Sequence, residues 1–152
     1  MKQHFRTCVL AAAMALAVSG VARAHDDDED ACSSATLNGL YVFTASGFNI
    51  VAGVPQPKAI VELIDFNGDG TATSGKTTVS RNGMILHSNG APGTYVLDRD
   101  CTGTLKFMDG GANPEFDLYV AFKGSQIQII QTGQAAIAGL PVFQGTAERV
   151  SR

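Results

Sequence analysis

The sequence predicts an all-β fold, an antiparallel up-and-down barrel of eight strands with one disulfide. A β-sandwich is the alternative. Segments of alternating or β-branched residues recur along the chain, turns containing Gly and Asn separate them, and no segment shows a convincing helical pattern. Because tight turns join consecutive strands, we expect a meander, and a meander of eight strands removes its exposed edges by closing on itself.

The first 24 residues have the features of a secretory signal peptide. Lys2 and Arg6 provide the positive start, Cys8–Val18 is apolar, and Ala22-Arg23-Ala24 fits a small-residue cleavage site. The apolar run is shorter than the roughly 20 residues that a membrane-spanning helix needs. We therefore expect cleavage after Ala24, no membrane span, and a periplasmic or secreted protein.

Removal of this peptide leaves 128 residues with eight basic and fourteen acidic side chains, a net charge of −6. Residues 25–36 begin with the run HDDDED and are expected to be largely disordered. Residues 37–152 have the length of one domain. The acidic balance and the absence of a basic patch argue against nucleic-acid binding.

The mature chain retains two cysteines, Cys32 and Cys101. Two cysteines in an oxidising compartment most often pair, and neither has the neighbours of a metal site. Cys101 lies at the turn of the hairpin Gly93–Met108, so we expect the disulfide to tie this hairpin to the start of the domain.

The remaining strands are separated by polar turns. We expect loops at Asn49–Pro57 and Ser88–Pro92 and tight turns at Asn67–Gly70 and Arg81–Gly83, because Asn-Gly and Asp-Gly pairs accept positive φ. Besides the hairpin, the expected strands are Leu37–Phe48 (alternating from Leu40), Ala59–Phe66, Thr71–Ser80, Met84–His87, Glu115–Phe122, Ser125–Thr132 and Val142–Val150.

Two weak metal-binding patterns are present. Asp65, Asn67 and Asp69 match the first half of a calcium loop, but position 12 is Lys76 and the flanks are strands, so a plain turn is favoured. His25 would become the N-terminal residue and could chelate copper, but His87 is the only other histidine of the mature chain. We therefore expect no metal and no cofactor.

No nucleophile elbow, P-loop or zinc-protease motif occurs in the sequence. Acid–base chemistry would fall to carboxylates or tyrosines that face inward, since burial can raise a carboxyl pKa. The weak candidates are Glu62, which shares a strand face with Ile60 and Ile64, and Tyr119. Alternation leaves open which face of each strand lines the interior, because both faces are apolar.

The stretch from Gly93 to Leu105, with Leu40–Phe48, Phe66–Gly70 and Gln126–Thr132, resembles small secreted bacterial proteins of the allene oxide cyclase-like, calycin-type barrels. The resemblance implies an eight-stranded barrel with a ligand-sized interior. Enzymes with such barrels act on apolar substrates without metal or organic cofactor. No catalytic residue of theirs matches a position here.

Two functions follow as expectations. The first is a secreted or periplasmic barrel that binds a small apolar ligand in its concave interior. The alternative is a cofactor-independent cyclase or isomerase that acts on an apolar substrate. The sequence leaves the ligand, the oligomeric state and enzymatic activity open.

Overall fold

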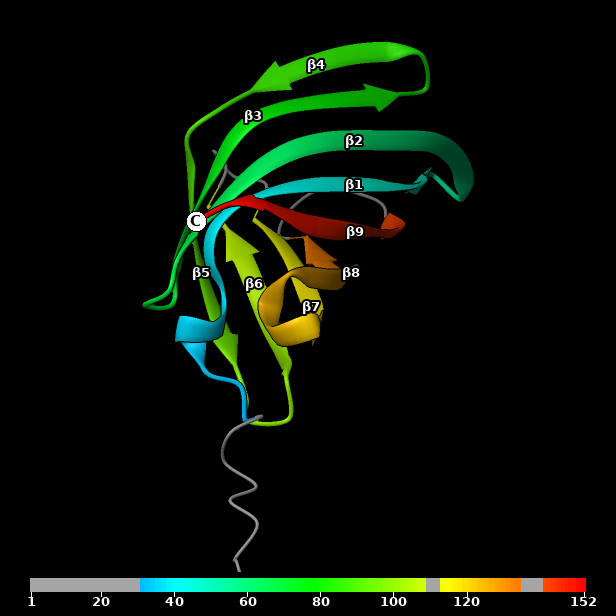
Figure 1. The fold of residues 1–152 in the computed structure, drawn as a ribbon. Coiled ribbons are helices and arrows are strands. Elements are labelled where there is room, and N and C mark those ends of the chain that lie inside the picture. The colour runs from blue at the N-terminus through cyan, green and yellow to red at the C-terminus, as the bar shows by residue number, and fades with distance from the viewer. Residues whose placement is uncertain (1–30, 109–112, 135–140) are drawn as a thin grey trace, which may run out of the picture.

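A computed structural model describes residues 31–108, 113–134 and 141–152, and shows a closed antiparallel barrel of eight strands (Figure 1). The helical pieces among the described residues are two three-residue 3-10 turns, η1 (Ser34–Thr36) and η2 (Phe122–Gly124), and neither could cross a membrane. The strands are β1 (Asn38–Val51), β2 (Val54–Asn67), β3 (Thr71–Arg81), β4 (Met84–Ser88), β5 (Ala91–Leu97), β6 (Thr102–Phe107), β7 (Pro114–Ala121), β8 (Gln126–Gln134) and β9 (Pro141–Ser151).

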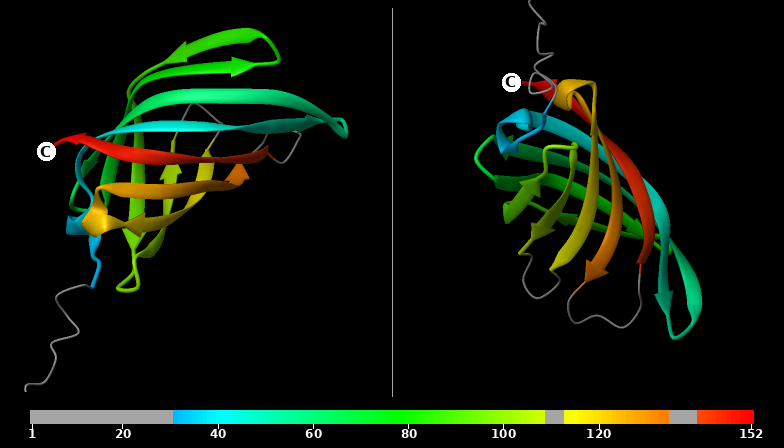
Figure 2. Two further views of the ribbon diagram at one scale, coloured as in Figure 1. Left: turned by 45° about the vertical axis from the view of Figure 1, so that its right-hand side comes forward. Right: turned by 90° about the horizontal axis from the view of Figure 1, so that it is seen from below.

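The barrel closes because β2 pairs with both β1 and β3. Around the ring the order is β2, β1, β9, β8, β7, β6, β5 and β3, so the predicted meander is confirmed with one exception. Strand β4 pairs only with the second half of β3, whereas β5 pairs with the first half. The β3–β4 hairpin therefore extends away from the ring as a flap, as both Figure 1 and Figure 2 show.

The predicted loop at Asn49–Pro57 is wrong. β1 continues to Val51, and β2 starts at Val54 after a two-residue turn. Pro55 and Pro57 fit into β2 because this part of the strand lies beyond its pairing with β3, which ends at Lys58. Beyond that ladder the β3–β4 turn contacts β2, where the Asn82 N–H donates to the Pro57 carbonyl oxygen at 2.8 Å. The two prolines therefore interrupt no ladder between β2 and β3.

Other predicted boundaries shift by a few residues. The expected loop Ser88–Pro92 shrinks to the connection between β4 and β5, and Phe122 belongs to η2 and not to the preceding strand. The turns at Asn67–Gly70 and Arg81–Gly83 are confirmed, and Asn82 and Gly83 both have positive φ, 48° and 84°.

Strands β1 and β9 approach each other closely through two glycines. A Cβ added to Gly47 would lie 1.9 Å from the Val142 carbonyl oxygen, and one added to Gly145 would lie 2.0 Å from the Thr44 oxygen. Any side chain at these positions would clash with the backbone of the paired strand. The glycines thus permit the close packing of two long strands that curve across the barrel.

We call the end of the barrel that carries η1, η2 and the disulfide the closed end. The predicted bond between Cys32 and Cys101 is present, and it ties the start of the domain to the β5–β6 turn across 69 residues. The amide N–H of Cys32 donates to the Arg99 carbonyl oxygen at 3.1 Å beside it. The signal peptide, His25 and the acidic run 26–30 lie outside the described residues.

Aromatic side chains fill the closed half of the interior. Tyr41, Phe66 and Tyr95 pack edge to face with ring centroids 5.1 Å apart in each successive pair. Leu37, from the segment that crosses this end, is fully buried against the core. The Tyr95 hydroxyl donates toward the carbonyl oxygens of Ser34 and Leu37, which holds that segment in place.

Candidate functional site

The opposite end, which carries the β1–β2 turn and the C-terminal ends of β6 and β8, is the open end. A cavity of about 130 Å³ lies there among the inward faces of the strands. Its lining combines three phenylalanines with polar and charged side chains. The lining residues are Lys58, Ile60, Glu62, Ser74, Thr77, Val79, Arg81, Ser88, Ala91, Phe107, Pro114, Phe116, Gln131 and Phe143.

The inward face of β2 changes from apolar to charged along its length. Phe66 and Ile64 are buried in the closed half, and Glu62 and Lys58 follow toward the open end. The alternation of side chains along a strand places all of them on one face. The barrel interior is filled by side chains around Phe66, whereas the cavity lies beside Lys58 and Glu62. The polar part of this strand face therefore lines the cavity.

A bulge in the β2–β3 pair determines the polar wall on β3. The register shifts between Glu62 and Ile64, and as a result Ser74 and Thr77 both point inward although they are three residues apart. Their hydroxyl oxygens are 3.2 Å apart. Beyond the bulge the inward face continues through Val79 to Arg81, which thereby enters the cavity.

Lys58 and Arg81 are directly paired across β2 and β3. The pKa of the Lys58 ammonium is lowered to about 8, chiefly by burial and also by the Arg81 guanidinium, while Glu62 acts in the opposite direction. The Lys58 Nζ atom lies 4.2 Å from the centroid of the Phe143 ring. A cation held in this way retains some stabilisation from the ring face while it loses hydration.

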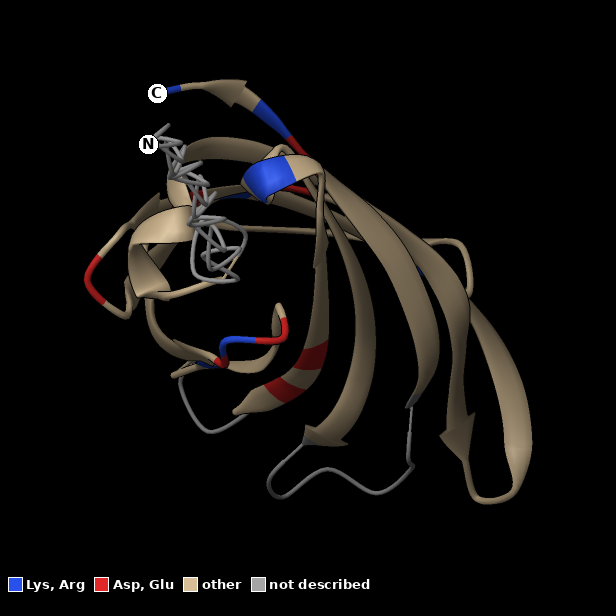
Figure 3. Cartoon of the chain, turned by 60° about the horizontal axis from the view of Figure 1, so that its bottom comes forward, with Lys and Arg blue, Asp and Glu red and all other residues tan. Residues whose placement is uncertain are grey.

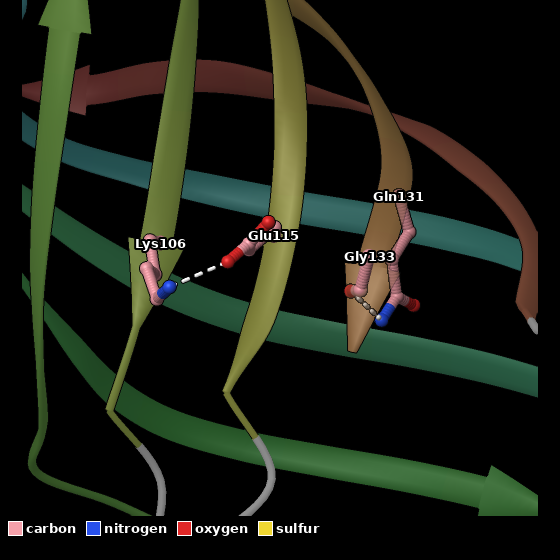
Figure 4. Close-up of polar contacts among 4 residues, drawn as sticks. All are labelled: Lys106, Glu115, Gln131 and Gly133. Carbon is pink, nitrogen blue, oxygen red and sulfur yellow. Dashed lines mark hydrogen bonds and ion pairs between the residues drawn. The ribbon is translucent and has the colours of Figure 1, made fainter. Parts of the chain in front are cut away.

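The polar groups of the cavity differ in their hydrogen bonding. The buried Gln131 amide donates from Nε2 to the Gly133 carbonyl oxygen at 3.3 Å, at the end of β8 (Figure 4). The Nε atom of Arg81 is buried and has no acceptor among the described residues. It is therefore a donor that a bound molecule could satisfy.

Phenylalanine rings form the apolar wall of the cavity. Phe116 packs edge to face against Phe107, at 6.4 Å between centroids, and against Phe43, at 6.3 Å. Phe43 in turn packs against Phe143 at 6.4 Å. These contacts join β1, β6, β7 and β9, so the wall belongs to the rigid core of the barrel.

One ion pair lies on the outer surface near the open end. Lys106 of β6 and Glu115 of β7 form an ion pair on the outer face, and both side chains are about half exposed (Figure 4). Figure 3 shows that most of the strand surface is neither acidic nor basic.

A second hollow, of about 510 Å³, lies outside the barrel at the closed end. Lys123, Arg149 and Arg152 line it together with the segment around Cys32. Arg149 is already engaged there, since its Nη2 donates to the Thr36 carbonyl oxygen at 2.8 Å. We regard this hollow as part of the packing of the closed end, and take the interior cavity as the candidate site.

The two candidate catalytic residues are placed differently. Glu62 is 6% exposed and lines the cavity. Tyr119 is 52% exposed on the outer face of β7, because its inward neighbours are Phe116 and Leu118. The structure therefore does not bring Tyr119 to the candidate site, and its proposed catalytic role has no support.

The half-motif for calcium forms a polar turn. Asp69 accepts hydrogen bonds from the backbone N–H and the hydroxyl of Thr71, at 2.8 and 2.6 Å, and Asn67 donates to the same hydroxyl oxygen at 2.8 Å. Asp65 lies exposed on β2. Among the described residues no group of three or more His, Cys, Asp or Glu could hold a metal ion.

Sequence reasoning missed Lys58 and Arg81. Lys58 fell between the predicted loop Asn49–Pro57 and the strand predicted to start at Ala59. It continues the alternation of Glu62 and Ile60, and extending that strand by one residue would have included it. Arg81 fell in the predicted turn, and its inward direction depends on the bulge near Ser74. No pattern of residue types marks that bulge.

Comparison with known proteins supports the fold. No protein-family model and no curated protein sequence matches this chain. Among solved structures, the chain is similar to an S-type phycobiliprotein lyase, CPES, from Guillardia theta, with a TM-score of 0.50 and 13% identity over 78% of this chain and 91% of that one. At this identity the similarity shows the barrel fold alone. The expected eight-stranded barrel is confirmed, whereas the allene oxide cyclase-like resemblance finds no family match.

Proposed function

We propose that this protein is an exported barrel that binds a small, largely apolar ligand in its open half. The observation that carries the proposal is the cavity of about 130 Å³ walled by phenylalanines. An engineered protein cavity of about 150 Å³ lined by apolar side chains takes up benzene. The enclosed space therefore suits a group about the size of one aromatic ring, or one end of a longer molecule.

The polar lining favours a ligand with one hydrogen-bond acceptor. The buried Nε of Arg81 offers a donor, and a ligand oxygen placed there would remove the cost of leaving it unsatisfied. The rest of the ligand would contact Phe107, Phe116 and Phe143. Ligand sites of this kind combine an apolar body with a few placed polar groups.

Export is supported by two features. The first 24 residues have the pattern of a signal peptide, and the structure contains a disulfide of the kind that persists in oxidising compartments. Detection of the chain in a periplasmic or culture fraction, cleaved after Ala24, would test this part of the proposal.

The binding test uses benzyl alcohol, titrated into the protein by calorimetry or by NMR shifts. Ser74→Leu places a larger side chain in the cavity and is expected to abolish binding, because Ser74 is buried and lines it. Thr73→Leu is the matched control, since this neighbour is exposed on the outer face of the same strand. Equal binding by both variants would place the ligand elsewhere and refute the proposal.

A cofactor-independent cyclase or isomerase is the second candidate, and the buried Glu62 favours it. A carboxyl group that lines a buried cavity is a means of moving a proton to or from a bound substrate. Glu62→Gln keeps the shape and removes the acid. Unchanged turnover of any substrate found for the protein would exclude Glu62 from its chemistry.

A further inference from the structure

The position of Lys58 combines three features that a lysine with a purely structural role would not require. Its ammonium group lines the interior cavity, lies over the ring of Phe143, and is paired in register with a second cation, Arg81. We propose that Lys58 reacts reversibly with a small aldehyde or ketone in this cavity to form an imine. The inference rests on the proposed ligand-binding function and names the chemical class of the ligand.

An amine must lose its proton before it can attack a carbonyl carbon. Lysines become nucleophilic when they are desolvated in an apolar pocket or placed beside another cation, and Lys58 has both features. With a pKa of about 8, roughly a quarter of its amine is neutral at pH 7.5, against about 0.1% for an ordinary lysine.

Charged groups that face Lys58 come from two strands. Arg81 on β3 disfavours the ammonium form, and Glu62 on β2 favours it. These three are the charged residues among the described lining of the cavity. The net effect is an amine that is partly neutral near physiological pH, with one acid and one fixed cation beside it.

The surroundings also suit the carbonyl partner. The buried Nε of Arg81 lacks an acceptor among the described residues and can donate to the carbonyl oxygen. That donor would polarise the carbonyl and stabilise the negative charge that develops on its oxygen. An aromatic or short aliphatic group would occupy the phenylalanine wall.

The reaction is balanced without any further reactant. The Lys58 Nζ lone pair forms a C–N bond to the carbonyl carbon, the C=O π bond breaks, and one amine proton moves to the oxygen to give a carbinolamine. A second amine proton then leaves with the hydroxyl group as water, and the C=N bond forms. Glu62, in the same cavity, can carry these protons.

The test traps the imine in the intact, disulfide-bonded protein with benzaldehyde and cyanoborohydride, which reduces an imine to a stable benzyl amine. Peptide mapping by mass spectrometry then measures the label on each lysine. We expect Lys58 to carry at least about tenfold more label than each exposed lysine at about pH 7.5, because those amines are almost fully protonated. The exposed comparators are Lys76, Lys106 and Lys123.

Two variants separate reactivity from a structural role. Lys58→Arg keeps the positive charge but has no amine, so it should lose the cavity label and leave that of the surface lysines unchanged. Arg81→Gln removes the neighbouring cation, so the pH at which Lys58 becomes labelled should move upward. A merely structural Arg81 would leave this pH profile unmoved.

Parallel titration with benzyl alcohol, which has the same ring but no carbonyl, distinguishes the two proposals. Binding of benzyl alcohol with even labelling of all lysines would overturn the imine and leave the ligand-binding function standing. Failure of benzyl alcohol to bind would overturn the ligand-binding function. Selective labelling of Lys58 together with binding would support both.

Discussion

Arg149 of β9 donates its Nε–H to the hydroxyl oxygen of Tyr41 on β1 at 2.9 Å, and its guanidinium carbon lies 5.3 Å from the centroid of the same ring. The Tyr41 hydroxyl in turn donates to the Gly124 carbonyl oxygen. Burial raises the pKa of Tyr41, while Arg149 opposes that shift. These contacts connect β1, β9 and η2 and so stabilise the closed end of the barrel.

Tyr41→Phe should therefore destabilise the protein by about 1–3 kcal/mol, because the buried Gly124 carbonyl and the partly buried Arg149 guanidinium each lose their hydrogen-bond partner. Urea unfolding would measure the loss. Tyr119→Phe is the matched control, since Tyr119 is exposed and should stay within about 0.5 kcal/mol of the parent. Equal stability of the two variants would contradict a stabilising role for the Tyr41 hydroxyl.

The disulfide is expected to contribute strongly to stability. Closing a loop of 69 residues stabilises a protein by about 4 kcal/mol in the chain-entropy model. The double variant Cys32→Ser, Cys101→Ser should lose about 2–4 kcal/mol of unfolding free energy. Reduction of the parent protein with dithiothreitol should give a similar loss. No change in either experiment would show that η1 and Leu37 hold the closed end without the bond.

Lys58 should make stability depend on pH in the alkaline range. Its pKa is about 8 in the folded protein and about 10.4 in the unfolded chain, so between these values the unfolded state binds more protons and stability rises with pH. The penalty for the buried charge is fully present below pH 8.

Lys58→Met should accordingly stabilise the protein at pH 7, by at most about 3 kcal/mol, and the gain should shrink toward about pH 10. Urea unfolding of parent and variant at both pH values would measure the difference. Lys76→Met, at an exposed position of β3, should show no such trend. A gain at pH 10 as large as that at pH 7 would contradict the lowered pKa.

Two turn carboxylates should contribute to stability toward acid. Hydrogen bonds from Thr71 lower the pKa of Asp69, and those from Thr102 lower the pKa of Asp100. Because these folded pKa values lie below the unfolded one, about 3.9, the stabilisation is present above it and is lost as the pH falls through the folded values.

Replacing both aspartates with alanine should lower the midpoint temperature of thermal unfolding at pH 6. It should also reduce the decrease of that midpoint between about pH 4 and pH 2. Asp65→Ala, on an exposed strand position, is the control. A double variant whose midpoint falls with acid as steeply as that of the parent would show that other carboxyl groups cause the loss.

The strand segments, most of the turns, the closed barrel and the disulfide could be predicted from the sequence. Period-two alternation and Asn-Gly turns act locally, over a few residues, and two cysteines allow only one pairing. The sequence did not predict that β1 continues to Val51 or that β2 starts at Val54 and includes Pro55 and Pro57. Prolines normally argue against a strand, and they are tolerated here because they lie beyond the end of the β2–β3 ladder, which only the assembled sheet defines.

The candidate site depends more strongly on tertiary structure. Glu62 could be identified as a candidate because its face could be read from alternation, but both faces of β2 are apolar, and only ring closure decides which one turns inward. The same ambiguity applied to Tyr119, and in the structure its side chain lies on the outer face of β7, because Phe116 and Leu118 occupy the interior.

By itself, then, the sequence determined the elements whose signals are local: strands, turns and the cysteine pair. The tertiary structure alone decided that Lys58 and Arg81 share a cavity. That outcome requires β2 to extend past its predicted start and β3 to shift its face at a bulge, and both depend on pairing between strands. A one-residue change in register reverses every side chain that follows, so the chemistry of the interior is decided by the assembled barrel.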